Sequence, residues 1–322
     1  MTIDLTQLAD QITLTPYQAL GIPLALIGAV FLAIGAQFQH QGVAIVESKL
    51  VGDKRAGLNF AQLRALLARP SWVLGTLMLG LAVVFQLASL VFAPLIVVQP
   101  LGAIALVITA VVNARVSKVP LDAVSIRAIV ACIGGVALFV TVAAFVAKSR
   151  PITEVQLVIV LAILAVVLTG WAVSFGLFRA RASSIYFIVG AGMLFGFVVT
   201  LAKVVIDRIK TLTLDEFRVS DAEWLTILCV VALVAAGLLG LYFVQTAYSS
   251  GPPDLVVAGL TVVDPIVAVS IGVIVLGEAA DAPLWSIFAF LFAGAIAIWG
   301  VFSLARHHPQ LRPGTQSVKA QG

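Results

Sequence analysis

Long apolar runs separated by short polar segments fill the chain from residue 17 to residue 305. A run of about 20 apolar residues crosses the hydrocarbon core of a bilayer when it forms a helix. The pattern predicts nine spans, over 17–45, 71–92, 94–115, 125–147, 155–178, 184–206, 224–248, 254–277 and 284–304. We therefore expect an all-α polytopic membrane protein with 9–10 transmembrane helices in a single bundle over 17–305.

Two of these spans are interrupted by a polar residue followed by proline. The span 94–115 contains Gln99–Pro100, and the span 254–277 contains Asp264–Pro265. Thirteen residues after the two prolines stand Asn113 and Glu278, respectively. An apolar helix broken at corresponding places in two halves of a chain is typical of a substrate site at a repeat interface.

The order of the spans predicts two inverted repeats, over about 17–147 and 155–305. Each repeat contains a tight turn rich in Gly or Pro, the span with the polar–proline pair and a final span rich in small residues. With nine spans, the two polar–proline spans run in opposite directions. The second half has five spans and the first has four, and we interpret the basic segment 54–69 as a short helix on the inner leaflet and a candidate for a tenth helix.

Asp264 is the strongest candidate for a functional group, because a carboxylate is costly inside a membrane. Pro265 removes one backbone hydrogen bond and frees a carbonyl one turn earlier. A free carbonyl beside a carboxylate suits a hard cation or a proton. The alternative is that Asp264 caps the helical segment that restarts at Pro265. Gln99 offers the same geometry without charge, which favours proton coupling or a single cation over a cage of several carboxylates.

Other polar side chains inside the spans are weaker candidates. Asn113 and Glu278 are interpreted as boundary or gate residues at opposite ends of the bundle. Residues that either line the pathway or bond helices to each other are Gln37, His40, Gln41, Gln86, Tyr242 and Gln245. For the group around His40, the alternative is a helix end that emerges into the inner headgroups. We expect Lys203 to extend its amine to the outer surface.

Composition narrows the class of protein further. Hydrophobic residues make up 61% of the chain and charged residues 11%, which excludes a soluble globular protein. The net charge of +4 does not indicate nucleic-acid binding, because no basic cluster is interleaved with exposed aromatics. The excess of Lys and Arg in alternate loops predicts an outer N-terminus and a cytoplasmic C-terminus in a cell membrane.

The sequence contains none of the motifs of an enzyme. It has no phosphate-binding loop, no Cys and His metal cluster and no nucleophile paired with a base. We expect no enzyme activity and no cofactor, and the identity of any metal stays open. The expected partners are the bilayer and a small solute or cation; a homodimer is left open.

The two ends of the chain are polar. Residues 1–16 contain two acids and no Lys or Arg, so we interpret them as a weakly amphipathic segment and not as a signal peptide. Residues 306–322 are expected to form a disordered cytoplasmic tail.

Several motifs in order resemble the drug/metabolite transporter (EamA-like) superfamily. The stretch 276–300, LGEAADAPLWSIFAFLFAGAIAIWG, resembles that superfamily's span ending in Leu-Gly-Glu followed by a Gly-containing final span. The stretches RPSWVLG (69–75) and APLIVVQPLG (93–102) are similar to the NIPA-type magnesium transporter branch. The resemblance implies two inverted repeats and transport, while Asn113 stands where the branch has an acid.

These observations together favour a secondary transporter with alternating access. The resemblance implies Mg²⁺ or another divalent cation as substrate. The broader superfamily implies, as the alternative, export or flipping of a small metabolite or a lipid-linked headgroup. A membrane scaffold subunit without transport is the alternative of another class.

Overall fold

The computed structural model describes residues 16–49, 66–116, 121–178, 183–214, 223–250 and 253–307. All regular secondary structure in these ranges is helical. The helices are α2 (Pro16–Lys49), α4 (Pro70–Phe92), α5 (Leu95–Leu101), α6 (Ala103–Val116), α7 (Ala123–Val146), α8 (Glu154–Phe178), α9 (Ser184–Leu214), α10 (Glu223–Ser250), α11 (Pro253–Ile274) and α12 (Leu284–His307).

The all-α polytopic prediction is confirmed. Within the described residues, nine segments are long and apolar enough to cross a membrane, and α5 and α6 together form one of them, Leu95–Val116. Helices are the expected form, because a bilayer core offers no water to satisfy exposed backbone groups. The largest difference in bounds is in α9, which continues to Leu214 where we expected an end near residue 206. The predictions for 1–15, 50–65 and 308–322 concern residues outside the described ranges.

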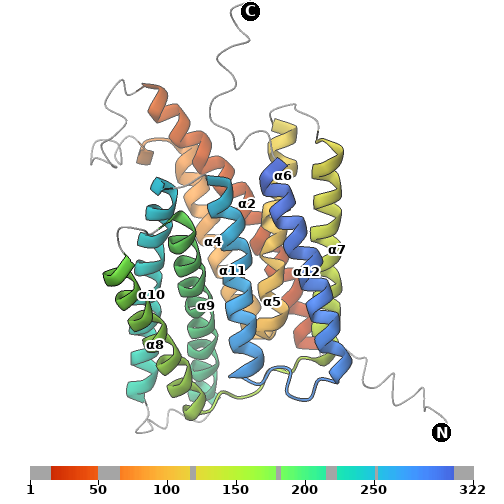
Figure 1. The fold of residues 1–322 in the computed structure, drawn as a ribbon, viewed down its shortest axis with the longest axis vertical. Coiled ribbons are helices and arrows are strands. Elements are labelled where there is room, and N and C mark those ends of the chain that lie inside the picture. Colours follow the sequence, from red (N-terminus) through yellow and green to blue (C-terminus); the bar gives the residue numbers. More distant parts are fainter. Residues whose placement is uncertain are drawn as a thin grey trace, which may run out of the picture.

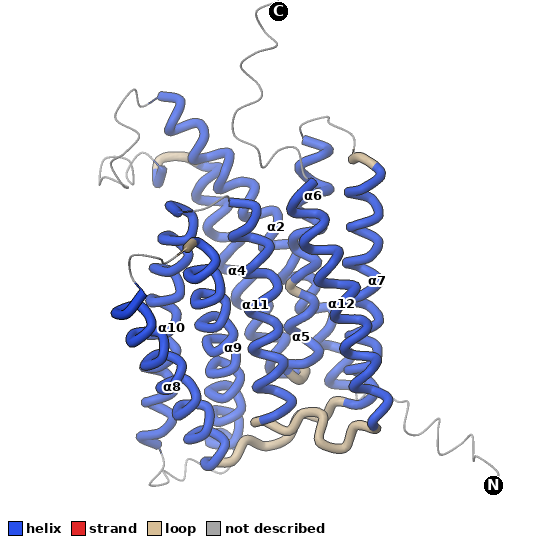
Figure 2. The backbone as a smooth tube through the Cα atoms, in the orientation of Figure 1, coloured by secondary structure: helices blue, strands red, loops and turns tan. Residues whose placement is uncertain are grey.

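The spans alternate in direction along the bundle. α2 begins at the lower end of Figure 1 and α12 finishes at the upper end, as an odd number of spans requires. The α4–α5 turn and the connections between α7 and α8 and between α11 and α12 lie at the lower end (Figure 2). Because Glu278 belongs to the last of these, we call this the Glu278 end of the bundle.

The same kinds of neighbours recur in the two halves of the chain. α2 packs against α4 and α6, while α9 packs against α10 and α11. Likewise, α5 packs against α7, and α11 packs against α12. Two further pairs, α7 with α12 and α5 with α11, join the halves. The helices joined by the two predicted tight turns therefore pack little against each other. α4 packs mainly on α2 and only slightly on α5, and α10 packs mainly on α9 and only slightly on α11.

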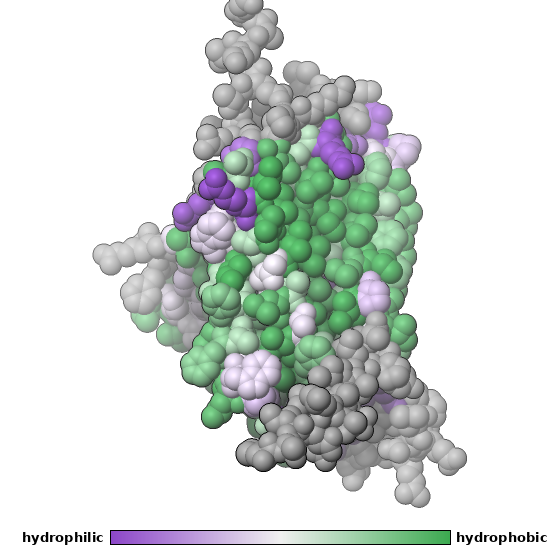
Figure 3. Space-filling model, turned by 90° about the vertical axis from the view of Figure 1, so that its right-hand side faces the viewer, coloured by the Kyte–Doolittle hydropathy of each residue, from purple (hydrophilic) through white to green (hydrophobic). Residues whose placement is uncertain are grey.

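The outer surface of the bundle is apolar. Figure 3 shows the side formed by α7 and α12 as a continuous hydrophobic face, with polar side chains gathered toward its upper end. Large apolar side chains point outward there, including Val130 on α7 and Phe288 and Leu291 on α12, which are 65%, 73% and 68% exposed. Such an apolar face, with polar side chains at its upper end, fits a multi-pass membrane protein surrounded by lipid.

Small residues bring the helices close together at the centre. A Cβ on Gly135 would lie 2.5 Å from the Ala297 nitrogen, so α7 and α12 touch through their backbones. On α9, a Cβ on Gly192 or Gly196 would clash with Val263 or Val267 of α11. The spacing Gly192-x-x-x-Gly196 therefore packs α9 closely against the helix that contains Asp264.

Candidate functional site

Gln99 and Asp264 lie on neighbouring helices, α5 and α11, that come from different halves of the chain. Gln99 is only 3% exposed and Asp264 is half-buried. The Gln99 Nε2 and Asp264 Oδ1 atoms are both buried without a hydrogen-bond partner among the described residues. A buried polar atom without a partner costs about 1–3 kcal/mol. The two side chains therefore keep binding capacity for a ligand or water.

The two prolines affect their helices differently. After Pro100 the helix is interrupted at Gly102, whose N–H donates to the Gln99 carbonyl at 3.1 Å, and α6 starts at Ala103. α11 runs through Pro265 without interruption. Each proline lacks the N–H that would bond the carbonyl four residues earlier. Each polar side chain consequently stands beside a local defect in the backbone hydrogen bonding of its helix.

A cavity of about 110 Å³ lies between the two halves, next to both prolines. Pro100 from α5 and Pro265 from α11 line it, and Thr261 is the lining residue whose carbonyl Pro265 leaves without a helical donor. Most other lining residues are apolar: Ala103, Val136, Phe139, Val262, Ile266, Val269, Ala297, Ile298 and Val301. Gln99 and Asp264, each one residue before a lining proline, do not themselves line the cavity.

The weaker candidates lie away from this cavity. Gln37 and Gln41 are half-buried on α2, and Gln86 is half-buried on α4. Gln245 is exposed on α10, and Tyr242, 60% exposed, lines a second cavity of about 260 Å³ between α8, α9 and α10. His40 belongs to α2, but its side chain lies outside the described part. None of the described members of this group lines the cavity beside the prolines.

Asn113 and Glu278 stand at opposite ends of the bundle, because α5 and α6 run opposite to α11 (Figure 1). Asn113 is half-buried near the end of α6. Glu278 is buried, and its carboxylate accepts the N–H of Leu95 at 2.8 Å and of Ile96 at 2.9 Å. These amides form the first turn of α5, so Glu278 caps a helix from the other half of the chain.

Glycine creates the space for this cap. Gly277 has a φ of 69°, a left-handed conformation that glycine adopts without strain, and it turns the chain after α11. At Gly272 a Cβ would lie 2.9 Å from Glu278 Oε2. Burial raises the pKa of the Glu278 carboxyl, while the Ile96 and Leu95 amides and the Lys203 charge act to lower it. The Leu-Gly-Glu motif is thus built as a buried cap for α5.

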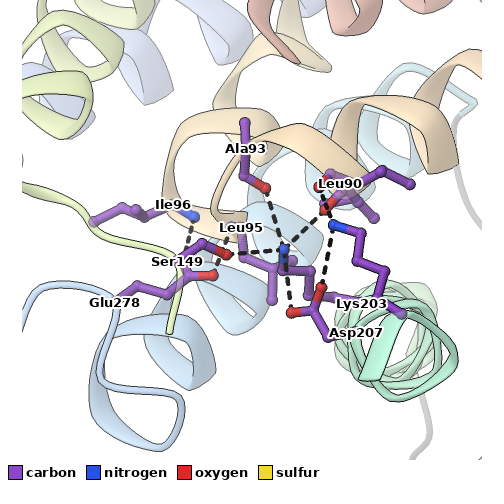
Figure 4. A network of polar contacts seen from close by, with 10 residues as sticks. Leu90, Ala93, Leu95, Ile96, Ser149, Lys203, Asp207 and Glu278 are labelled. Carbon is purple, nitrogen blue, oxygen red and sulfur yellow. Dashed lines mark hydrogen bonds and ion pairs between the residues drawn. The ribbon is translucent and has the colours of Figure 1, made fainter. Parts of the chain in front are cut away.

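The expectation for Lys203 was wrong. Its amine does not extend to the surface: the side chain is 2% exposed and donates to the carbonyl of Leu90 at 2.8 Å (Figure 4). Lys203 Nζ also lies 3.3 Å from the Asp207 carboxylate. The spacing of Lys203 and Asp207, four residues apart on one helix, is typical of an ion pair and is the local signal for this contact. The carbonyl targets on α4 lie more than a hundred residues away in sequence, and no local pattern indicated them.

Among the described residues, no three His, Cys, Asp or Glu side chains cluster closely enough to hold a metal ion. The polar groups instead lie at two places: Gln99 and Asp264 stand on the packed helices α5 and α11, and Lys203 and Glu278 hold the α4–α5 turn.

The described residues contain nine apolar spans and a cavity between the halves beside two prolines within helices, which are features of a membrane transporter. The family model described as "Magnesium transporter NIPA" matches residues 17–309, and the chain belongs to this family. It is similar to an uncharacterised protein of Corynebacterium glutamicum, with 25% identity over 295 residues that cover 89% of this chain and 95% of the relative. No solved structure matches the chain.

Proposed function

We propose that this protein transports Mg²⁺ or another divalent cation across a cell membrane by alternating access, using a site between α5 and α11. Family membership supports the substrate class. The observation that carries the site is the pair of unpartnered buried atoms, Gln99 Nε2 and Asp264 Oδ1, on helices that join the two halves. We therefore assign cation binding to Asp264 and Gln99.

The chemistry of the pair suits a partly hydrated cation. Mg²⁺ keeps several of its waters and is typically held by one or two carboxylates. Asp264 supplies one carboxylate, and Gln99 presents its amide oxygen when the side-chain amide is turned over, since the two orientations have nearly the same shape. The carbonyl of Thr261, left without a helical donor by Pro265, is a third candidate oxygen, from a residue that lines the cavity.

Alternating access rests on the inverted relation of the halves. α5 and α6 run opposite to α11, and the neighbours of α2 resemble those of α9 (Figure 1). In such a pair of repeats, each half is able to exchange conformation with the other around a fixed central site. The excess of basic residues in alternate loops supports an outer Glu278 end and a cytoplasmic end at the close of α12.

Uptake of Mg²⁺ into proteoliposomes tests the proposal. Asp264→Asn removes the charge at constant shape, and we expect it to abolish uptake of Mg²⁺ reported by an enclosed indicator dye. The matched control is Asp281→Asn, which removes an exposed carboxylate outside the spans. Uptake by Asp264→Asn at the wild-type rate would exclude Asp264 as a cation ligand.

The apolar cavity favours a second candidate, transport of a small organic solute. Val136 and Phe139 on α7 and Ala297 on α12 offer a surface that matches an apolar group better than a hydrated ion. Thermal stabilisation of the purified protein separates the two candidates. Stabilisation by Mg²⁺ that is lost in Asp264→Asn supports the cation, whereas stabilisation by metabolites or polyprenyl-phosphate lipids alone supports the solute.

A further inference from the structure

The sharp turn at Ala93–Pro94 joins two helix ends of opposite polarity. α4 ends at Phe92, and its last carbonyls point toward the turn, while α5 starts at Leu95 with amides that have no partner within the helix itself. The C-terminus of a helix carries a partial negative charge and the N-terminus a partial positive charge. A cation beside α4 and an anion beside α5 therefore stabilise this turn.

The cation comes from α9. Lys203 Nζ donates to the carbonyls of Leu90 at 2.8 Å and Ala93 at 3.5 Å (Figure 4). One turn beyond Asp207, Lys210 donates to the carbonyl of Val91. The lysines of α9 thus satisfy the end of α4, and the Asp207 carboxylate partly balances their charge.

The anion comes from the segment that follows α11. Glu278 accepts the Leu95 and Ile96 amides, as described above, and its own carbonyl accepts the N–H of Lys148 at 2.8 Å. Lys203 extends the same cluster by donating to Ser149 Oγ at 3.1 Å. Four segments therefore meet at the Glu278 end: the α4–α5 turn, the α7–α8 connection, α9 and the α11–α12 connection.

The contacts of this cluster cross between the two halves of the chain. Lys203 and Glu278 belong to the second half, and the turn that they hold belongs to the first. Gln99 follows Leu95 by four residues, which is about one helical turn. Because α5 ends at Leu101, its first turn is the part of the helix that determines where Gln99 lies.

We infer that Lys203 and Glu278 form a clamp that positions α5, and that release of this clamp opens the Glu278 end of the transport pathway. The opening of a pathway rests on the proposed function, because it assumes that the protein transports a solute. The clamp itself rests on the contacts described above. Rocking of the halves at this end separates α5 from Glu278 and the end of α4 from Lys203. Lys203 and Glu278 act as positioning residues through α5, without contact to the transported cation.

A buried cysteine behind the clamp reports its state. Cys132 and Cys229 are the two native cysteines and both are buried, so Cys132→Ala and Cys229→Ala give a background for Val98→Cys. Val98 is 2% exposed and lies one residue before Gln99. In lipid nanodiscs, the rate of its modification by a membrane-impermeant maleimide measures how often this end opens.

We expect Glu278→Gln to raise the labelling rate roughly tenfold, because it removes the charge-assisted hydrogen bond from one amide. Gly272→Ala should act in the same direction with both charges intact, since its Cβ displaces the carboxylate from α5. Asp281→Asn, which alters an exposed ion pair in the same connection, and Gly134→Ala, whose Cβ meets nothing within 4 Å, should label like the parent.

Lys203→Arg and Lys203→Met separate charge from packing. Arginine keeps the positive charge, so its labelling should stay closer to the parent than that of methionine. Each variant is compared only if its melting temperature shows a folded protein. Parent-like labelling in both Glu278→Gln and Gly272→Ala would overturn the clamp.

The outcomes distinguish the clamp from the proposed function. If Asp264→Asn abolishes Mg²⁺ uptake while the clamp variants label like the parent, the transport function stands and the clamp fails. If the clamp variants label rapidly while the wild type carries no divalent cation, the clamp stands and the substrate is wrong. If both hold, the clamp variants should also change the maximal uptake rate more than the half-saturating concentration of Mg²⁺.

Discussion

Two groups of polar residues involve the helix α5: the Lys203–Glu278 cluster and the pair Gln99 and Asp264. They differ in how many of their buried polar atoms have a hydrogen-bond partner. At the first turn of α5, the Leu95 and Ile96 amides both bond to Glu278. One turn later, Gln99 Nε2 has no partner among the described residues, and neither has Asp264 Oδ1 on the facing helix. A satisfied buried network holds structure in one place, whereas unsatisfied groups keep capacity for a ligand. The first cluster therefore fits a structural clamp and the second a binding site.

The same contrast extends to the helices that carry the clusters. The Lys203–Glu278 cluster ties four segments together at one end of the bundle, and the side chains of Lys203 and Glu278 are buried. Gln99 and Asp264 each precede a proline that removes a backbone hydrogen bond from its helix, and both prolines line the cavity between the halves. Mutations that act on the two clusters should therefore change stability in opposite directions.

The largest expected effect is at the clamp. Lys203→Met leaves Asp207 and the end of α4 without their buried cation, and breaking a buried ion pair on one side costs about 3–5 kcal/mol. We expect a correspondingly lower free energy of unfolding in a denaturant titration. Asp281→Asn is the control, because its partners Arg150 and Lys148 are exposed, and it should cause no measurable change. A Lys203→Met protein as stable as the wild type would remove the structural basis for the clamp.

A smaller effect of opposite sign is expected at the site. Gln99→Leu replaces a buried side chain whose Nε2 has no partner by an apolar side chain of similar size, which should raise the free energy of unfolding by about 1–3 kcal/mol. The same variant should reduce Mg²⁺ uptake, because an oxygen ligand is lost. Ser89→Ala provides the contrast: the Ser89 hydroxyl donates to the Gly21 carbonyl at 2.8 Å, so its loss should destabilise the protein. A destabilised Gln99→Leu would mean that Gln99 is part of a satisfied network.

The finest distinction is in pH dependence. Burial raises the pKa of Glu278 above its ordinary value of 4.5, so this carboxyl takes up a proton at a higher pH than an exposed glutamate does. Protonation of Glu278 removes the negative charge that attracts the α5 amides and Lys203. Asp207 is the neighbouring acid, and its charge also raises the pKa of Glu278. Labelling of Val98→Cys should therefore rise as the pH falls through that raised pKa.

The matched variant for this pH profile is Glu278→Gln, which should give a flat labelling profile over the same range. Asp281 is not expected to contribute, because the hydrogen bond and charge of Arg150 lower its pKa and keep it ionised there. A profile that persists unchanged in Glu278→Gln would assign the titration to another group.

Much of the architecture follows from the sequence, because the bilayer makes apolar length a direct signal. A run of some 20 apolar residues has one stable form in hydrocarbon, the helix, and the prolines marked where it is disrupted. The nine spans were predicted from such features and are confirmed within the described residues, and the resemblance to the NIPA family, predicted from motifs such as RPSWVLG (69–75), is confirmed as well. The inverted repeat, the membrane orientation and the assignment of Asp264 and Gln99 as ligands stay predictions.

The sequence alone therefore determined the set of helices and the polar–proline pairs within them. Both features depend only on residues that are close together along the chain. The tertiary structure decided what each polar group meets. Lys203 had the local pattern of a side chain that reaches the surface, and only packing of α9 against α4 brought its amine to the Leu90 carbonyl. Glu278 read as a boundary residue, and only the approach of α11 to α5 made it a buried cap 183 residues away in sequence from Leu95. Capping across a bundle depends on which residues come close together in space. The hydropathy pattern along the chain does not report which distant residues become neighbours.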